Sequence, residues 1–273
     1  MDRRKLKRRL LLWLAVLAAL GGYILWGNTS IRVTEIPFTS HDIPENFSGY
    51  RIVHISDLHN EEFGADNVRL LAKITDCRPD VIFLTGDILD SYHTDVEVAI
   101  SFVQRAVQIA PTYFVTGNHE KRVMTEYETL RAAMLEAGVR VLENELTTLE
   151  HNGSTISLLG LHDPAFTSVQ DQLSIQAPSS EDFTILLAHH PELVDDYAGA
   201  GMDLVFSGHA HGGQFRLPFI GGLLAPHQGV FPEYDAGLYR VENTALIVSR
   251  GLGNSAFPFR LNNRPEIILT VLN

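Results

Sequence analysis

Five short apolar runs in this sequence end in side chains of the kinds that bind metal ions in proteins. The side chains that follow these runs are Asp57 and His59, Asp87, Asn118 with His119 and Glu120, His189, and His209 with His211. Members of an i, i+2 pair project to the same side of extended backbone. Glycine stands directly before Asp87, Asn118 and His209, and a residue without a side chain lets a turn come close to an ion.

The elements that must position these turns are strands, and the hydrophobic pattern predicts them. We expect strands over 51–56, 81–85, 112–116, 155–161, 183–188, 204–207, 238–241, 246–249 and 267–271, and helices over 67–76, 95–109, 125–137 and 191–200. Helices separate the first three strands, which should be parallel, whereas the strand-rich C-terminal part favours antiparallel pairs. If the strands lie side by side, all five turns converge on one carboxyl edge, where open α/β sheets bind ligands.

Seven of these side chains are too many for one zinc ion, whose sites are usually tetrahedral. The seven are Asp57, His59, Asp87, Asn118, His189, His209 and His211. Two ions that share a bridging carboxylate would use all of them, and paired ions stabilise both the attacking and the leaving oxygen of a phosphoryl displacement. Imidazole, carboxylate and amide ligands without thiolate fit manganese, iron or zinc. We therefore expect two divalent ions as cofactors.

The set Asp-x-His, Gly-Asp, Gly-Asn-His-Glu, His and Gly-His-x-His, in that order, resembles the calcineurin-like metallophosphoesterases over about residues 50–273. The resemblance implies a layered αββα fold of class α/β. In that fold, helices flank two packed mixed β-sheets, and a dinuclear metal site lies at the C-terminal ends of strands. It implies one ion held by Asp57, His59, Asp87 and His211, and a second held by Asp87, Asn118, His189 and His209. His119 would bind no metal but would contact the phosphate and help the leaving group depart.

Two further stretches, Gly212-Gly213-Gln214 and the C-terminal 249–253 with 265–267, are similar to a bacterial branch of that family. This branch contains membrane-anchored phosphohydrolases, some of which cleave UDP-2,3-diacylglucosamine. The resemblance implies a metal-dependent phosphoesterase that hydrolyses a phosphoester or pyrophosphate bond of a lipid-linked or cell-envelope substrate. A nuclease of the same fold and a metal-site scaffold that binds partners without catalysis are the alternatives.

The N-terminus has the pattern of a membrane anchor. Residues 1–9 hold six basic side chains, and residues 10–26 form an uncharged apolar run that spans about 25 Å as a helix. The basic cluster should stay cytoplasmic, which places a linker over 27–49 and the catalytic domain over 50–273 outside the cytoplasm, as a single-pass protein of the cell membrane. A cleaved signal peptide and a twin-arginine export signal are competing interpretations.

The charge of the body disfavours nucleic acid as a partner. Beyond residue 9 the chain holds 15 basic and 32 acidic side chains, a net charge of −17, which repels a phosphate backbone. A single cysteine, Cys77, excludes an internal disulfide framework and is expected to be a packing residue. The expected partners are a phosphorylated substrate and the bilayer, and the expected state is a monomer.

Other side chains leave two interpretations open. Arg250 and Arg260 are candidate phosphate-binding residues or surface ion pairs, and His162 and His227 are candidates for the cleft. We expect His54 in the core, His190 on the face opposite its neighbour His189, and His41, His93 and His151 in solvent. The apolar stretch 214–226 is either a buried cover over the sheet or a patch for an acyl chain or a bilayer surface.

Overall fold

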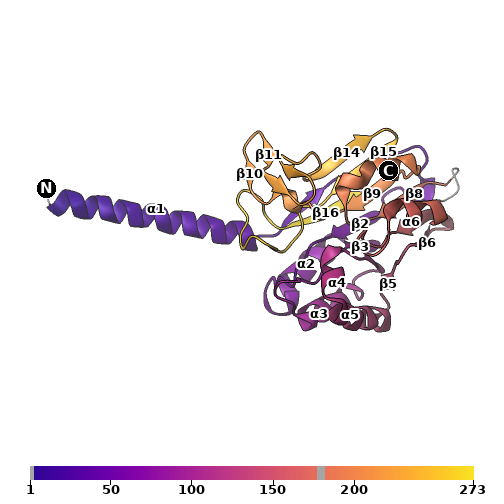
Figure 1. The fold of residues 1–273 in the computed structure, drawn as a ribbon, viewed down its shortest axis with the longest axis horizontal. Coiled ribbons are helices and arrows are strands. Elements are labelled where there is room, and N and C mark those ends of the chain that lie inside the picture. Colours follow the sequence, from indigo (N-terminus) through magenta and orange to yellow (C-terminus); the bar gives the residue numbers. More distant parts are fainter. Residues whose placement is uncertain (1–2, 177–181) are drawn as a thin grey trace.

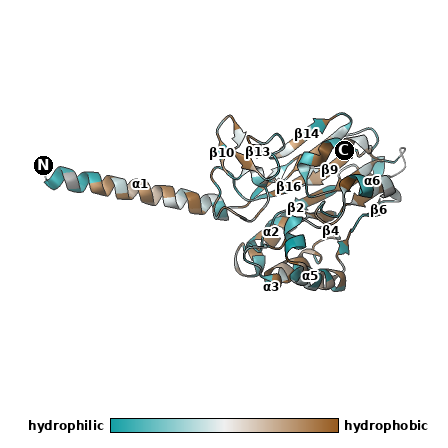
Figure 2. Ribbon diagram, in the orientation of Figure 1, coloured by the Kyte–Doolittle hydropathy of each residue, from teal (hydrophilic) through white to brown (hydrophobic). Residues whose placement is uncertain are grey.

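The computed structural model describes residues 3–176 and 182–273, which form one long helix and a layered α/β body (Figure 1). The helix α1 (Arg3–Thr29) projects from the body, and its long apolar side chains are exposed. By length and composition it is the one helix of the described residues that could cross a membrane. Figure 2 shows its hydrophilic N-terminal end and the hydrophobic residues that follow.

Within the described residues, the body contains two six-stranded mixed sheets. The first has the order β1 (Arg32–Glu35), β16 (Glu266–Val271), β2 (Arg51–Ile55), β3 (Val81–Thr85), β4 (Thr112–Val115) and β5 (Arg140–Val141). The strands β2, β3 and β4 are parallel, as the sequence predicts, and β16 runs antiparallel to β2. The register places Val53 beside Ile82 and Leu84 beside Phe114.

The second sheet brings the later strands together. Its order is β14 (Gly237–Val241), β15 (Thr244–Val248), β9 (Leu204–Ser207), β8 (Thr184–Leu187), β7 (Ser154–Gly160) and β6 (Glu145–His151). The pairs β14 with β15 and β6 with β7 are antiparallel, whereas β15, β9, β8 and β7 run parallel. The expectation of antiparallel pairs in the C-terminal part is confirmed for β14 with β15, whereas β8, β9 and β15 pair parallel and β16 pairs antiparallel with β2 from the N-terminal part.

The core lies between the sheets because β side chains alternate between two faces. In β3, Val81 and Phe83 face the other sheet, whereas Ile82 and Leu84 face helices. Phe83 contacts Phe206 of β9 across the interface, with ring centroids 5.4 Å apart. The αββα layering that the resemblance implies is confirmed.

Helices cover the outer face of each sheet. On the first lie α2 (Val68–Asp76), α3 (Val96–Ala106) and α5 (Met124–Ala137), which bury Leu70, Phe102 and Leu130. On the second lie α6 (Val169–Gln176) and α7 (Val194–Gly199), which bury Leu173 and Tyr197. The short elements are α4 (Asn118–Arg122), η1 (Glu45–Phe47), η2 (Ala65–Asn67), η3 (Pro191–Leu193), η4 (His211–Gly213), and the hairpin strands β10 (Arg216–Leu217), β11 (Gly221–Gly222), β12 (Leu224–Ala225) and β13 (Gly229–Val230).

The segment 27–49 is not a free linker, in contrast to the sequence-based expectation. Residues 32–35 form β1 at the edge of the first sheet, and Phe38 and Phe47 are buried in the core. The end of α1 contacts the body directly. The Asn28 side chain donates to the Arg260 carbonyl at 3.0 Å and accepts from the Arg260 N–H at 2.7 Å. The helix therefore joins the body almost without a spacer.

Gly208, which follows β9, lies where the two sheets meet. A Cβ at this position would overlap Ser56 Oγ and lie 2.5 Å from Asp57 Oδ2. We expect Gly208→Ala to lower the melting temperature, because overpacking costs about 1–3 kcal/mol. Calorimetry in the presence of a chelator separates this effect from metal binding.

Gly199→Ala is the matched control, because a Cβ there meets nothing within 4 Å. We expect its melting temperature to match or slightly exceed that of the wild type. A Gly208→Ala protein that melts with the control would contradict the close contact between the strand ends.

Candidate metal centre

The five turns meet at the junction of the two sheets rather than along the edge of one. Those after β2, β3 and β4 come from the first sheet, and those after β8 and β9 come from the second. Two hydrogen bonds hold the sheets together here. The His209 N–H donates to the Asp57 carboxylate at 3.1 Å, and His189 Nδ1 lies 2.6 Å from the Thr85 carbonyl.

One group of side chains surrounds the position expected for the first ion. His211 Nε2 lies 3.4 Å from Asp57 Oδ1 and 3.2 Å from His59 Nε2. His59 Nε2 lies 3.7 Å from Asp87 Oδ2 and 3.9 Å from Asp57 Oδ1. These four atoms point toward one another, and all four side chains are buried.

A second group shares Asp87. His189 Nε2 lies 3.2 Å from Asp87 Oδ2 and 3.2 Å from His209 Nδ1. Asn118 lines a cavity that also borders Asp87 and His209. Its Oδ1 is buried without a hydrogen-bond partner. Asp87 Oδ2 therefore faces imidazoles of both groups.

The donor set fits two divalent ions. Buried polar atoms are normally hydrogen-bonded, so the unpaired Asn118 Oδ1 and the facing nitrogens of His59 and His211 fit a role as cation ligands. The His189–Thr85 hydrogen bond places one proton of His189 on Nδ1, so Nε2 is the atom that would bind an ion. Burial lowers the pKa of His189, but Asp87 raises that pKa well above its usual value, so an ion at Nε2 must displace a proton. The clusters Asp57–His59–His211 and Asp87–His189–His209 can each hold a metal ion.

The backbone is strained at the ligands. Asp57, His59, Asp87, His209 and His211 all have φ between 47° and 64°, in the left-handed region that non-glycine residues seldom occupy. Such conformations cost of order 1–3 kcal/mol each, and they cluster at functional sites. Turn residues away from the site, such as Arg78 and Asn152, share this conformation, so the strain supports the side-chain chemistry but does not identify the site alone.

Burial and local charge tune the titrating groups toward cation binding. Burial would raise the pKa of Asp87, but the His189 imidazole beside it holds that pKa well below its usual range. Burial lowers the pKa of His59 and His209, and lowers that of His211 to about 4. The carboxylate is therefore charged and these three imidazoles are neutral near pH 7, the forms in which they bind metals.

His119 lines the cavity beside the ligand groups. Its Nδ1 accepts a hydrogen bond from the Ser91 N–H at 2.9 Å, and a neutral ring that accepts there carries its proton on Nε2, which the Arg122 guanidinium, also a donor, approaches at 3.3 Å. Nε2 lies 4.0 Å from Asp87 Oδ2 and 3.3 Å from Ser255 Oγ. His119 can thus present an N–H to a group bound in the cavity.

Two acidic residues that the sequence analysis did not assign support these side chains. Asp90 Oδ1 lies 3.3 Å from His119 Nδ1 and 3.8 Å from His59 Nδ1. Glu120 accepts the N–H groups of Asp87, Leu89 and Gly117 at 2.8–3.0 Å, although burial and Asp87 raise its pKa to about 8. Their positions in the sequence could have indicated both residues, because Asp90 and Glu120 each lie two or three residues beyond a predicted ligand.

The arginines differ in how they relate to the cavity. Arg260 is buried and donates to the carbonyls of Arg250 and Gly253, and its Nη2 lies 3.4 Å from His211 Nδ1. Arg250 Nε lies 3.5 Å from Glu266. Of the described arginines, Arg122 lines the cavity, with Nη1 3.3 Å from His119 Nε2. The sequence analysis missed Arg122, which its place in the turn after Gly-Asn-His-Glu could have indicated.

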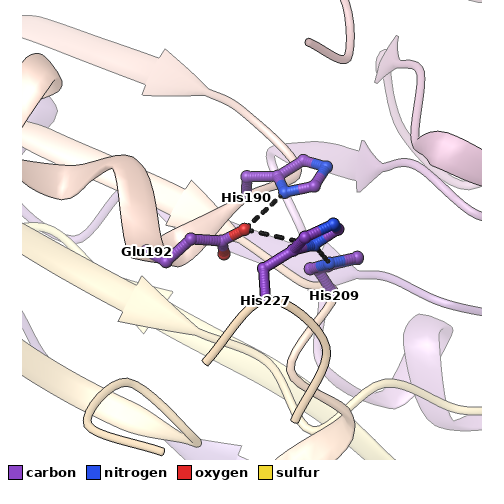
Figure 3. A group of neighbouring side chains, drawn as sticks. All are labelled: His190, Glu192, His209 and His227. Atoms are coloured by element: carbon purple, nitrogen blue, oxygen red, sulfur yellow. Dashed lines mark hydrogen bonds and ion pairs between the residues drawn. The ribbon is translucent and has the colours of Figure 1, made fainter. Parts of the chain in front are cut away.

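His190 does not lie on the opposite face, so that expectation is wrong. Its ring centroid is 4.1 Å from that of His209, and its two nitrogens lie 2.7 Å from Glu192 and 2.8 Å from Asp163. His227 lines the cavity, and its Nδ1 lies 2.8 Å from His209 Nε2 (Figure 3). Both histidines therefore adjoin the second ligand group.

The remaining histidines largely follow expectation. His54 is fully buried and bonded to Thr85 Oγ1 at 2.7 Å, and His41 and His93 are exposed. His162 lies 2.9 Å from Thr116 Oγ1 and stacks on Phe166. His151 is half-buried rather than fully solvated, because its ring packs edge-on against Tyr50 at 4.9 Å. Cys77 is buried, as expected of a packing residue.

The cavity has both polar and apolar lining residues. Its volume is about 330 Å³, and the lining includes the polar residues Asp87, Asn118, His119, His209 and His211 and the apolar residues Leu224, Ala225, Pro226, Ala256 and Phe257. The stretch 214–226 is not a buried cover, because Phe219 is wholly exposed and Ile220 largely so. Phe215 packs against Phe257 and Phe259, which joins this stretch to the segment that contacts α1.

Comparisons with known proteins agree with this geometry. The chain is 31% identical over 249 residues to the uncharacterized metallophosphoesterase YkuE of Bacillus subtilis, across 89% of this chain and 85% of that protein. It is 29% identical over 259 residues to a bovine (Bos taurus) transmembrane protein with metallophosphoesterase domain, across 88% of this chain and 56% of that protein.

The fold recurs in a solved structure. The crystal structure of TT1561 of Thermus thermophilus superimposes with a TM-score of 0.51 at 14% identity, across 75% of this chain and 91% of the other. The family model for calcineurin-like phosphoesterases matches residues 50–213, the part that carries all seven candidate ligands and His119. On the sequence match and the strand-end ligand clusters together, this chain belongs to the calcineurin-like phosphoesterases, which are metal-dependent hydrolases of phosphoesters.

Proposed function

We propose that this protein is a membrane-anchored, two-metal phosphohydrolase that cleaves a phosphoester or pyrophosphate bond of a lipid-linked substrate. The observation that carries the proposal is the cavity itself. Asp87, which the two buried ligand groups share, lines the cavity together with the apolar residues 224–226 and 256–257. The polar residues suit a phosphate, and the apolar residues suit the start of an acyl chain.

We assign one ion to Asp57, His59, Asp87 and His211, and the second to Asp87, Asn118, His189 and His209. Paired divalent ions such as manganese, iron or zinc would activate water and neutralise charge on the transferred phosphoryl group. The protein side chains supply the rest. His119 offers its Nε2 proton to the leaving oxygen, Ser91 holds its ring tautomer, and Arg122 adds a positive charge nearby.

The attachment of α1 supports a substrate presented at a membrane. The Tyr23 hydroxyl donates to Asn262, and the Arg264 guanidinium lies 4.8 Å from the Trp26 ring. The chain segment 254–264, which carries Asn262 and Arg264, also places Ser255 and Phe257 in the lining of the cavity. Because α1 joins the body without a long spacer, the cavity stays close to any bilayer that α1 crosses, and tethering raises the effective concentration of a membrane substrate.

The metal assignment predicts different outcomes for two variants. Asp87→Ala should reduce metal content at both sites, with Asp87→Asn as the isosteric companion, because this carboxylate faces both groups. His119→Ala should keep both ions but lower kcat about 10²–10⁴-fold, the usual contribution of a general acid. Elemental analysis beside kinetics in Mn²⁺ measures both effects. One ion per chain in active wild type, or full turnover by His119→Ala, would refute the assignment.

The basic cluster of residues 3–9 predicts the orientation of the protein. Its six positive side chains should keep the N-terminus in the cytoplasm and the body outside. Protease added to spheroplasts should digest the body, and a C-terminal reporter that works only after export should be active. Full protection of an expressed body would show the reverse orientation.

If the substrate is lipid-linked, its turnover should depend both on the acyl chain and on the apolar residues of the cavity. We expect kcat/KM to be higher for a lipid phosphate in vesicles than for its deacylated head group, and Leu224→Ser with Phe257→Ser, two changes in the apolar lining of the cavity, to narrow that difference. Leu135→Ser on α5 is the matched control, because Leu135 is an exposed apolar residue that does not line the cavity. Equal efficiency on both substrates in every variant would exclude a lipid-linked substrate.

A further inference from the structure

Four side chains form a cluster that shares His209 with the second ligand group and reaches the surface. His190, Glu192, His209 and His227 lie close enough together to suggest a third cation site (Figure 3). The geometry at His209 and His227 argues against an ion between those two residues. Their rings are nearly coplanar, at 18° with centroids 5.0 Å apart, and the two facing nitrogens are 2.8 Å apart. A separation of 2.8 Å is typical of a hydrogen bond between the two nitrogens. It is too short for both nitrogens to bind one ion that lies between them, because each metal–nitrogen bond is about 2 Å long.

The direction of this hydrogen bond follows from the other nitrogen of His209. His209 Nδ1 faces His189 Nε2 at 3.2 Å within the second ligand group. To bind an ion there, Nδ1 must be unprotonated, so the neutral ring carries its proton on Nε2. His209 Nε2 then donates to His227 Nδ1, and the neutral His227 ring carries its own proton on Nε2.

The neighbouring groups do not compete for this hydrogen bond. Glu192 Oε1 lies 2.7 Å from His190 Nδ1 but 3.5 Å from His227 Nδ1, and His190 Nε2 lies 2.8 Å from Asp163. The short contacts thus pair His190 with its two carboxylates and leave His227 to His209. This pairing accounts for the cluster without a third ion.

The turn that carries His227 is held in place. His227 has φ of 58°, and the Gln228 N–H donates to the Pro226 carbonyl at 2.7 Å. The Gln228 side chain bonds both the N–H and the carbonyl of Tyr234, at 2.9 Å and 3.0 Å. The His227 side chain is 60% exposed and lines the cavity, so the far side of its ring is open to a ligand.

We propose that His227 is a positioning residue for the second metal site and a phosphate-binding residue of the cavity. It accepts the Nε2 proton of His209, which fixes the tautomer that leaves His209 Nδ1 free for the ion. Its own Nε2–H then donates to a phosphate oxygen in the cavity. The inference rests on the proposed role of His209 as a ligand of the second ion.

The test separates the two roles of His227 by substitution in the full-length protein. His227→Ala removes both nitrogens, whereas His227→Asn keeps an acceptor, Oδ1, where Nδ1 stands and removes the distal N–H. Titration of metal-free protein with Mn²⁺ measures the affinity of each ion, and calorimetry of the Mn²⁺-loaded protein measures the affinity for inorganic phosphate. His41→Ala is the matched control, because His41 is exposed and does not line the cavity.

We expect His227→Ala to weaken the second ion about 10–100-fold, the usual effect of losing a hydrogen-bond partner of a metal-binding histidine. His227→Asn should restore that affinity but bind phosphate about tenfold more weakly than wild type, since one hydrogen bond to a charged group is lost. The inference would be overturned, and the proposed function would stand, if wild type binds two ions and His227→Ala binds the second ion as tightly as wild type does. The same holds if His227→Asn binds the second ion no more tightly than His227→Ala. A single ion in wild type would overturn both.

Discussion

Asp87 carries a buried negative charge on which the arrangement of the whole site depends. Its Oδ1 accepts a hydrogen bond from the backbone N–H of His119 at 2.8 Å. Its Oδ2 faces His189 from the second sheet and His59 from the first. A buried carboxylate is costly unless cations or hydrogen bonds offset the lost hydration. Packing two sheets so that their strands end around one carboxylate provides a place where two cations supply that charge.

The site stores strain that the rest of the fold must support. Five ligand residues and His227 have left-handed backbone conformations. The hydrophobic layer between the sheets, with Phe83 and Phe206 in contact, holds the strand ends from which these turns leave. The same rigidity fixes His189 through the Thr85 carbonyl and Asp57 through the His209 N–H. Strained turns on a rigid core keep the ligands in place before any ion binds.

The sequence predicted the strand ends well because the hydrophobic pattern is a local signal, and the candidate ligands lie just beyond those ends. The division of the strands between two sheets follows from the family resemblance and not from the hydrophobic pattern, since pairing joins residues far apart in the chain. Residues 32–35 were taken for linker because a four-residue edge strand carries little pattern. His190 was misplaced because β8 ends at Leu187, so the alternation of a strand no longer applies. His151 is partly covered by Tyr50, a contact between distant segments.

The helix α1 and the candidate metal centre meet in one segment of the chain. Residues 254–264 contact α1 through Arg260 and Arg264, and Arg260 also reaches His211. The central claim remains the pair of ions that share Asp87. Anomalous diffraction from crystals grown with Mn²⁺ tests it most directly. The account predicts two manganese peaks with Asp87 as a ligand of both, and His59 and His189 on different ions. A single peak, or two peaks of which only one contacts Asp87, would contradict it.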